Sequence, residues 1–292
     1  MMSLRKRRII LAICVLAFLL AVPAILLYTD GYRIDSTFHL YKTGGLYVSS
    51  PISGSTIFVN NIEKKQTNIL QSGLFLQSLK PGKYAILIAK DGYWPWLKNL
   101  EVKEEMVTEA RAMLVPKEPE AKILLRENYS PLETPDYDKI LKTLKEINGK
   151  LETDKKKKSI PEEEIEKNYT RLTTNEKEKI WWNPKENKLW AEWAGEQDSI
   201  PYFFCDDKSC AGKTLILDSK YEIRNADFYP KRKDVVIVAV QNGIFAIEID
   251  SRGGRLLQPI YKGKNPIFTT NKNENAIYIL EEENILIKIK LE

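Results

Sequence analysis

The feature that most constrains the fold of this chain is a long apolar run near its beginning. The run extends from Ile9 to Tyr28 without a charged residue and follows a basic block, Arg5, Lys6, Arg7 and Arg8. At about 1.5 Å per residue it would form a helix of roughly 30 Å, the hydrocarbon thickness of a bilayer. Basic flanks favour the cytoplasmic side. We therefore expect residues 1–8 to be cytoplasmic, 9–28 to cross the lipid bilayer, and the remainder to be extracytoplasmic.

A cleaved signal peptide is the main alternative to this anchor. Val22, Pro23 and Ala24 could serve as the small residues before a cleavage site. The run continues beyond them to Tyr28, which makes it longer than the apolar region of a usual signal peptide. A lipoprotein signal fits less well, because Cys14 lies deep inside the run. The length and the flanks favour an uncleaved, single-pass anchor.

The charge of the chain reflects this topology. The net charge is +5 and the isoelectric point is near 8.8, but the basic block supplies most of the excess. Acidic and basic residues are mixed through the rest, and no helix pattern carries a basic stripe interleaved with aromatics, as a nucleic-acid groove needs. We expect no nucleic-acid partner.

Two cysteines outside the apolar run, Cys205 and Cys210, predict a disulfide. The four residues between them form turns readily, and apolar residues at 202–204 and 214–217 flank them, which indicates a β-hairpin. Residues facing each other across a hairpin are about 4.5–5.5 Å apart between Cα atoms, within reach of a disulfide that persists outside the cytoplasm. Two free thiols are the alternative. Metal binding is disfavoured because His39, the only histidine, is far away in sequence.

Residues 45–116 have the pattern of short strands separated by turns. Apolar residues recur in Tyr84–Ala89, and turn-forming pairs such as Asn60-Asn61 and Asp91-Gly92 end the strand segments. About six short strands in roughly 70 residues predict a small antiparallel β-sandwich. The clearest expected strands cover residues 46–49, 56–59, 84–89, 96–102 and 108–115.

Three motifs occur in order within this region: Pro51-Ile52-Ser53-Gly54-Ser55-Thr56-Ile57-Phe58-Val59-Asn60, Leu79-Lys80-Pro81-Gly82-Lys83-Tyr84 and Lys90-Asp91-Gly92-Tyr93. Together they resemble the PEGA domain, with Ser53 and Ser55 standing where Glu and Ala are usual. The resemblance covers residues 45–116. It implies a β-rich module of a prokaryotic surface or membrane-attached protein, and it brings no catalytic residues.

Trp94 and Trp96 lie close together in the same region. Exposed on the edge of a sandwich, they could contact a sugar ring or a protein partner. The alternative is that one of them fills the core of the sandwich while the other lies on its rim.

Residues 117–172 predict a linker with one short helix. After Pro135, apolar residues recur on one helical face, and Gly149 would end the helix. The charge runs at 155–158 and 162–164 favour a solvated segment over a membrane-surface or partner site.

The last segment, residues 173–292, contains an internal repeat. Trp182, Phe228 and Phe268 each precede a polar turn and a strand, and they stand 46 and 40 residues apart. Such periods are typical of propeller blades, and the segment resembles propellers of the WD40 or TolB type without a Trp-Asp signature. Only about three units fit, whereas closed propellers have about four to eight blades. Either residues 117–172 add strands, or the array is open and exposes edges that a partner would cover.

No catalytic signature accompanies these modules. The chain has no nucleophile elbow, phosphate loop or metal-ligand set, and Gly253-Gly254 predicts a hairpin turn. We expect no enzyme activity and no cofactor. We expect a mainly β, membrane-anchored binding or scaffold protein with a protein or cell-envelope partner. A glycan-binding protein, or a wall hydrolase acting through two carboxylates, is the alternative.

Overall fold

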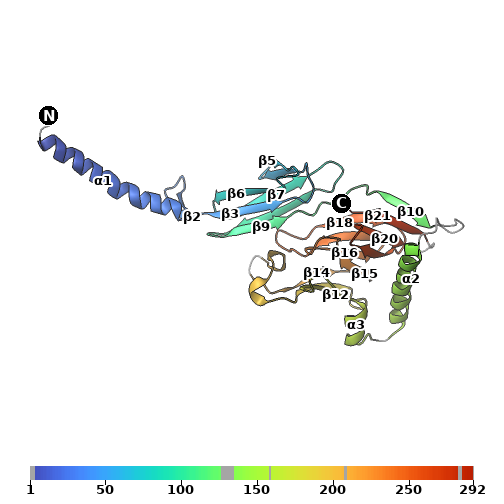
Figure 1. Ribbon diagram of the computed structural model, residues 1–292. Coiled ribbons are helices and arrows are strands. Elements are labelled where there is room, and N and C mark those ends of the chain that lie inside the picture. The colour runs from blue at the N-terminus through green and yellow to red at the C-terminus, as the bar shows by residue number, and fades with distance from the viewer. Residues whose placement is uncertain (1–3, 126–134, 158, 207–208, 282–284, 292) are drawn as a thin grey trace.

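The computed structural model describes residues 4–125, 135–157, 159–206, 209–281 and 285–291. Lys158, Asp207 and Lys208, which belong to the predicted charge run and to the predicted cysteine turn, lie outside the described residues. The protein is mainly β, as expected, with one helix projecting from a β-rich body (Figure 1).

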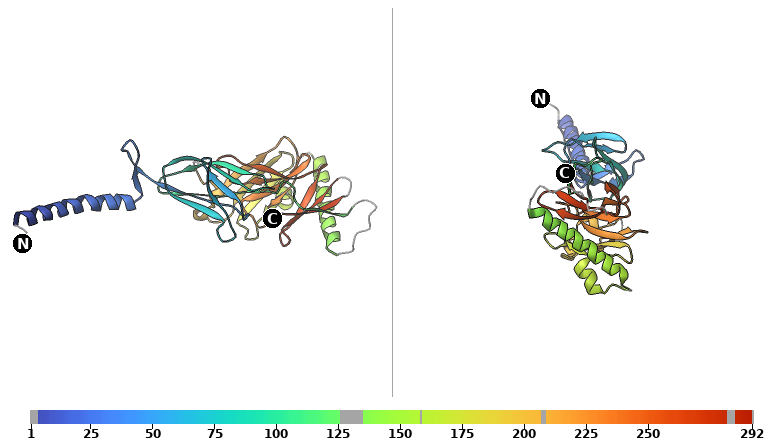
Figure 2. Two further views of the ribbon diagram at one scale, coloured as in Figure 1. Left: turned by 90° about the horizontal axis from the view of Figure 1, so that it is seen from above. Right: turned by 90° about the vertical axis from the view of Figure 1, so that its right-hand side faces the viewer.

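Helix α1 (Leu4–Thr29) contains the apolar run and projects away from the body in Figure 1 and in the left view of Figure 2. None of its most apolar segment is buried, and it is long and apolar enough to cross a membrane, although a signal sequence has the same properties. A hairpin that the sequence did not predict follows it, formed by β1 (Tyr32–Ile34) and β2 (Leu40–Lys42). Asp35 closes this hairpin by accepting hydrogen bonds from the backbone of Thr37 and His39.

Two sheets form the module predicted for residues 45–116. Their strands run in the orders β6-β3-β9 and β5-β4-β7-β8, and their inward side chains meet in one hydrophobic cluster. The expected strands at 56–59 and 96–102 have the predicted bounds. The strands are β3 (Gly44–Ser49), β4 (Thr56–Val59), β5 (Ile62–Gln66), β6 (Gly73–Leu79), β7 (Gly82–Ala89), β8 (Trp96–Val102) and β9 (Val107–Arg111).

The sandwich differs from the prediction in two respects. β9 pairs with β3 in parallel, so the sandwich is not wholly antiparallel. β9 also ends at Arg111, and Ala112 to Val115 leave the sheet to become buried between the sandwich and the following sheets. The predicted turn at Asn60-Asn61 is confirmed, since both residues have the positive φ that a tight hairpin requires.

Three four-stranded antiparallel sheets follow, and segments expected in the linker complete two of them. The first sheet has the order β11-β12-β13-β14, the second β15-β16-β17-β18, and the third β10-β21-β20-β19. Thus β10 and β11, from the predicted linker at 117–172, are strands paired with β21 and β12. Of the two alternatives, the structure shows that this segment adds strands, although the described sheets do not close into a ring.

The bounds of these strands follow. They are β10 (Ala121–Leu125), β11 (Thr170–Leu172), β12 (Glu178–Asn183), β13 (Lys188–Trp193), β14 (Lys213–Asp218), β15 (Ile223–Phe228), β16 (Val235–Val240), β17 (Gly243–Glu248), β18 (Leu257–Lys262), β19 (Ile267–Asn271), β20 (Ala276–Leu280) and β21 (Leu286–Lys290). The predicted turn at Gly253-Gly254 lies between β17 and β18, and both glycines have positive φ.

Two further helices connect the third sheet to the first. Helix α2 (Pro135–Lys156) begins where the sequence predicted but passes through Gly149, so the predicted end was wrong. A glycine costs a helix only about 1 kcal/mol, and Leu144 packs on the third sheet to hold this one. Helix α3 (Glu162–Asn168) uses the acidic run 162–164 as its first turn, where negative charge is favourable.

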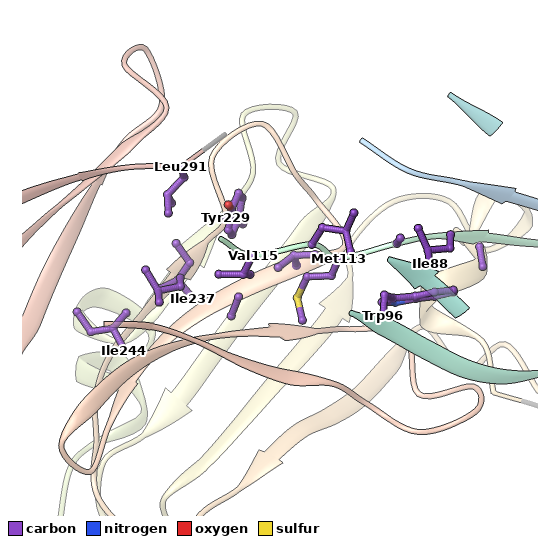
Figure 3. Packing of buried hydrophobic residues seen from close by; sticks show 14 of the residues in the cluster. Ile88, Trp96, Met113, Val115, Tyr229, Ile237, Ile244 and Leu291 are labelled. Carbon is purple, nitrogen blue, oxygen red and sulfur yellow. The ribbon is translucent and has the colours of Figure 1, made fainter. Parts of the chain in front are cut away.

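The sandwich and the second and third sheets share one hydrophobic core. Trp96 and Ile88 of the sandwich belong to the same cluster as Ile237 and Ile244 of the second sheet, with Met113 between them (Figure 3). A second cluster lies between the first and second sheets and includes the buried repeat residue Trp182. The predicted modules are therefore packed into one body.

A buried charge cluster reinforces this junction. The Lys98 side chain on β8 is fully buried, with Nζ 3.0 Å from Glu248 Oε2 and 2.9 Å from the Asp250 carbonyl oxygen. Burial raises the pKa of the Glu248 carboxyl, and the nearby Lys98 opposes that rise. The Trp96 indole N–H also donates to Glu248. Each charge thus has a partner on the opposite side of the junction.

Replacing Lys98 with methionine tests the importance of this cluster. Lys98→Met should lower the free energy of unfolding by about 3–5 kcal/mol at neutral pH, because Glu248 would stay buried without its cation. The deficit should shrink as the pH falls, since a carboxyl with a raised pKa binds its proton more tightly in the folded state than in the unfolded chain. Chemical denaturation of the full chain in detergent micelles measures both effects.

Lys83→Met on the neighbouring strand β7 is the matched control, because Lys83 is exposed. It should change the free energy of unfolding by less than about 0.5 kcal/mol. A Lys98→Met protein as stable as the unmodified chain at neutral pH would contradict this role for the cluster.

Candidate functional site

The basic block lies at one end of α1, away from the body. Arg5, Lys6, Arg7 and Arg8 are exposed, and the apolar side chains that follow them are exposed as well. Positive charge at the start of a helix is unfavourable for the helix dipole, so the block does not serve helix stability. Its position suits a membrane flank.

Trp94 and Trp96 have separate environments. Trp96 is 1% exposed and belongs to the shared core, so it is not available as a surface contact. Trp94 is 37% exposed, and the ammonium of Lys117 lies 5.7 Å from the centre of its ring. The pair therefore matches the alternative in which one tryptophan fills the core and the other lies on the rim. Trp96 contacts the core at the junction with the second sheet as well as the core of the sandwich.

The predicted disulfide between Cys205 and Cys210 is present, with the two Cα atoms 4.0 Å apart. The predicted hairpin around it is wrong in one part, because Tyr202–Phe204 forms the short 3-10 helix η2 and not a strand. A helical turn allows the adjacent Phe203 and Phe204 both to pack in the second cluster, whereas a strand would direct them to opposite faces. Another 3-10 helix, η1 (Gln197–Ser199), precedes it.

The first sheet carries an aromatic pair that the sequence analysis missed. Trp181 on β12 and Trp190 on β13 are cross-strand partners whose ring centres are 5.9 Å apart and whose planes differ by 13°. Lys213 on β14 places its ammonium 5.3 Å from both ring centres. Both tryptophans are half-buried, while Trp182 is buried on the opposite face. The available signal was the adjacent pair Trp181 and Trp182, because a strand directs neighbouring side chains to opposite faces and so leaves one of the two on the outer face.

A small pocket lies where β11 and β12 of the first sheet and β15 of the second sheet meet helices α2 and α3. Its volume is about 120 Å³, and its wall includes Arg171 on β11, Trp182 on β12, and Arg224 and Asn225 on β15. Residues of α2 and α3 cover it, including Lys150 and Lys167. Arg171 lies over the face of Trp182 at 5.3 Å and donates to the Thr170 carbonyl. The pocket was not predicted, because its residues come from five separate elements.

Among the described residues, no group of three or more His, Cys, Asp or Glu side chains could hold a metal ion. The buried carboxylates of Glu248 and Asp250 face Lys98 inside the junction. They are structural in this position, because the sandwich covers them.

No protein-family model matches the chain, and no curated protein gives a significant match to it. The function is therefore inferred from the arrangement of its own residues.

Removing the disulfide should have a modest effect. The Cys205→Ser, Cys210→Ser double variant should lose at most about 2 kcal/mol of unfolding free energy, because a bridge across so short a loop restricts few unfolded conformations. Denaturation of the full chain measures this, and Cys14→Ser, which removes the free cysteine, is the control. A loss above about 4 kcal/mol would show that the bridge holds more than its own loop.

Proposed function

We propose that this protein is a single-pass membrane anchor and scaffold that holds a β-rich binding body on the extracytoplasmic side. The observation that carries the proposal is α1, whose apolar side chains are exposed all round its surface while the body leaves them uncovered. Exposed apolar surface of this extent requires a lipid or protein environment. The basic block at residues 5–8 supports a cytoplasmic N-terminus, and the disulfide suits an oxidising compartment.

The finer description of the body is part of the same proposal. Residues 45–116 are proposed as a PEGA-like module, and the three four-stranded sheets as an open propeller-like array. The repeat residues Trp182, Phe228 and Phe268 support the second assignment, since all three are buried and each lies in the strand that precedes a polar turn. The buried junction at Lys98 would make the two modules one rigid unit, as a scaffold needs.

The proposed partner of the body is a protein or another component of the cell envelope. Trp94 and the Trp181–Trp190 pair are the surface aromatics that support this, since aromatic residues contribute strongly to protein contacts. The mixed charges of the body do not favour nucleic acid.

Topology is the direct test. In spheroplasts that carry the full chain with a tag at each end, external protease should remove the C-terminal tag and leave the N-terminal tag intact. Replacing Arg5, Lys6, Arg7 and Arg8 with serine should let part of the protein insert in the opposite orientation. Replacing four exposed lysines of the body with serine is the control and should leave the orientation unchanged.

Two outcomes would contradict the anchor. Protection of the C-terminal tag in spheroplasts would place the body in the cytoplasm. Separation of the N-terminal tag from the mature protein would identify the apolar run as a cleaved signal.

Binding of glycans is a second candidate function, and the Trp181–Trp190 pair favours it. Nearly parallel indole rings on a sheet surface offer a flat apolar face on which a sugar ring can stack, and Lys213 beside them can donate hydrogen bonds to hydroxyl groups. This candidate does not require catalysis.

Cell-wall oligosaccharides should then quench the tryptophan fluorescence of the full chain. Trp190→Ala should weaken binding by about tenfold or more, as expected for a central aromatic contact, while Trp94→Ala should leave it unchanged. No quenching at millimolar oligosaccharide would remove this candidate. Release of reducing sugar during the titration would favour the hydrolase alternative.

A further inference from the structure

The pocket between the first two sheets and the helices has the chemistry of an anion site. Its wall contains four basic side chains, Lys150, Lys167, Arg171 and Arg224, and no carboxylate. Like charges placed together destabilise a fold unless something neutralises them. The pocket therefore concentrates positive charge, and a bound anion would reduce the repulsion between these side chains.

Arg171 is the central cation of this arrangement. Its guanidinium donates to the carbonyl oxygens of Asn168 and Thr170 and to the side chain of Asn225, at 3.1, 2.8 and 3.4 Å. These hydrogen-bond partners are neutral and orient the guanidinium. Asp227 is close enough to attract it, but no salt bridge joins the two residues, and none involves Arg171 elsewhere in the described part of the chain. Burial lowers the pKa of Arg171, and Asp227 partly opposes this.

Trp182 supplies an independent observation that points to a ligand with acceptor oxygens. Its side chain is 1% exposed and forms part of the pocket wall, and its Nε1–H has no hydrogen-bond partner within the described part of the chain. A buried N–H without an acceptor costs about 1–3 kcal/mol. An oxygen atom of a bound anion would accept this hydrogen bond while its charge meets Arg171.

The acidic side chains nearest the pocket already have partners. Asp154 accepts from the Tyr169 hydroxyl and pairs with Lys157 at 2.9 Å, and Asp227 accepts from Thr270. Glu222 pairs with Lys155 and Glu164 with Lys157. These carboxylates are thus directed to other cations or donors, and none of them belongs to the pocket wall, to which the four basic residues contribute. Arg224 also donates to the Pro266 carbonyl, so Arg171 and the two lysines are the cations on which the site depends.

The location of the pocket restricts the source of the anion. The helix α2, which covers the pocket, lies at the opposite end of the body from α1 (Figure 2). A lipid headgroup of the membrane that holds α1 would therefore not reach it. A volume of about 120 Å³ accommodates one small oxyanion group.

We propose that this pocket binds a phosphate group, either free or carried by a soluble molecule or envelope polymer. The guanidinium and indole N–H groups of the pocket can only donate hydrogen bonds, and a phosphate group has several oxygen atoms that can accept them at once. The two flanking lysines, on α2 and α3, would hold the helices against the sheets when the anion is present. The proposal goes beyond the scaffold function and does not depend on the topology of α1.

The test is a titration of the full chain in detergent micelles, labelled with ¹⁵N in its tryptophan side chains. Inorganic phosphate should shift one indole N–H resonance, and Trp182→Phe should remove that resonance. Sodium chloride at equal ionic strength should not reproduce the shift. Glycerol phosphate oligomers distinguish the source: tighter binding than inorganic phosphate indicates a polymer, and equal binding indicates free phosphate.

Charge variants complete the design. Arg171→Gln should weaken phosphate binding by about tenfold or more, because it removes the central cation. The double variant Lys150→Gln, Lys167→Gln alters only exposed side chains, so it should fold, and it should weaken binding several-fold. Lys142→Gln, an exposed lysine on α2 that is not part of the pocket wall, is the matched control.

The proposal would be overturned by an absence of any phosphate-dependent shift in the unmodified chain. It would also be overturned if the Lys150→Gln, Lys167→Gln protein, folded by its thermal unfolding profile, bound phosphate as tightly as the Lys142→Gln control.

Discussion

The body of this protein depends on a junction in which Lys98 is buried together with its counter-charges. A lysine without exposure is stable only where carboxylates and carbonyl oxygens replace water, and Glu248 and Asp250 provide these from a segment about 150 residues further along the chain. The pairing also fixes orientation, because a different docking of the sandwich would leave Lys98 and Glu248 buried and unpaired. The hydrophobic contacts around Trp96 and Met113 contribute area, whereas the charges specify one arrangement.

Hydrogen bonds from side chains of the second-sheet region to the backbone of residues 112–115 complete the junction, one side chain donating and the other accepting. Arg232 donates to the Ala112 carbonyl while it pairs with Asp234, and Gln258 accepts from the backbone N–H of Val115. These contacts add side-chain partners to the backbone of residues 112–115, where the Ala112 N–H also donates to the Ser49 carbonyl and the Val115 carbonyl accepts from the Trp94 N–H. A buried segment of this kind requires hydrogen-bond partners, since its N–H and C=O groups have no access to water, and here both the sandwich and the second sheet provide them. The sandwich and the second sheet are therefore mutually dependent.

The path of the chain after residue 115 explains why the three sheets form one array and why a pocket exists. The chain first adds β10 to the sheet that its last strands build, then crosses through α2 and α3 to begin the first sheet with β11. This crossing places the helices over the region where β11, β12 and β15 meet, and it brings Lys150 and Lys167 beside Arg171. The segment 117–172, predicted as a solvated linker, thereby supplies one strand to each of two sheets and covers a cationic cavity.

The local sequence determined the elements whose signals are short in range. The uncharged run from Ile9 to Tyr28 determined α1, the Asn60-Asn61 pair determined a hairpin, and the spacing of Cys205 and Cys210 determined the disulfide. Tertiary structure decided the rest: the pairing of β10 with β21, the helical turn at Phe203, the burial of Trp96 and the gathering of basic residues around Trp182. These features arise from contacts between distant segments. Turn formation and hydrophobic length are properties of neighbouring residues, whereas the partner of a strand or a buried charge is set by the free energy of the whole packed chain.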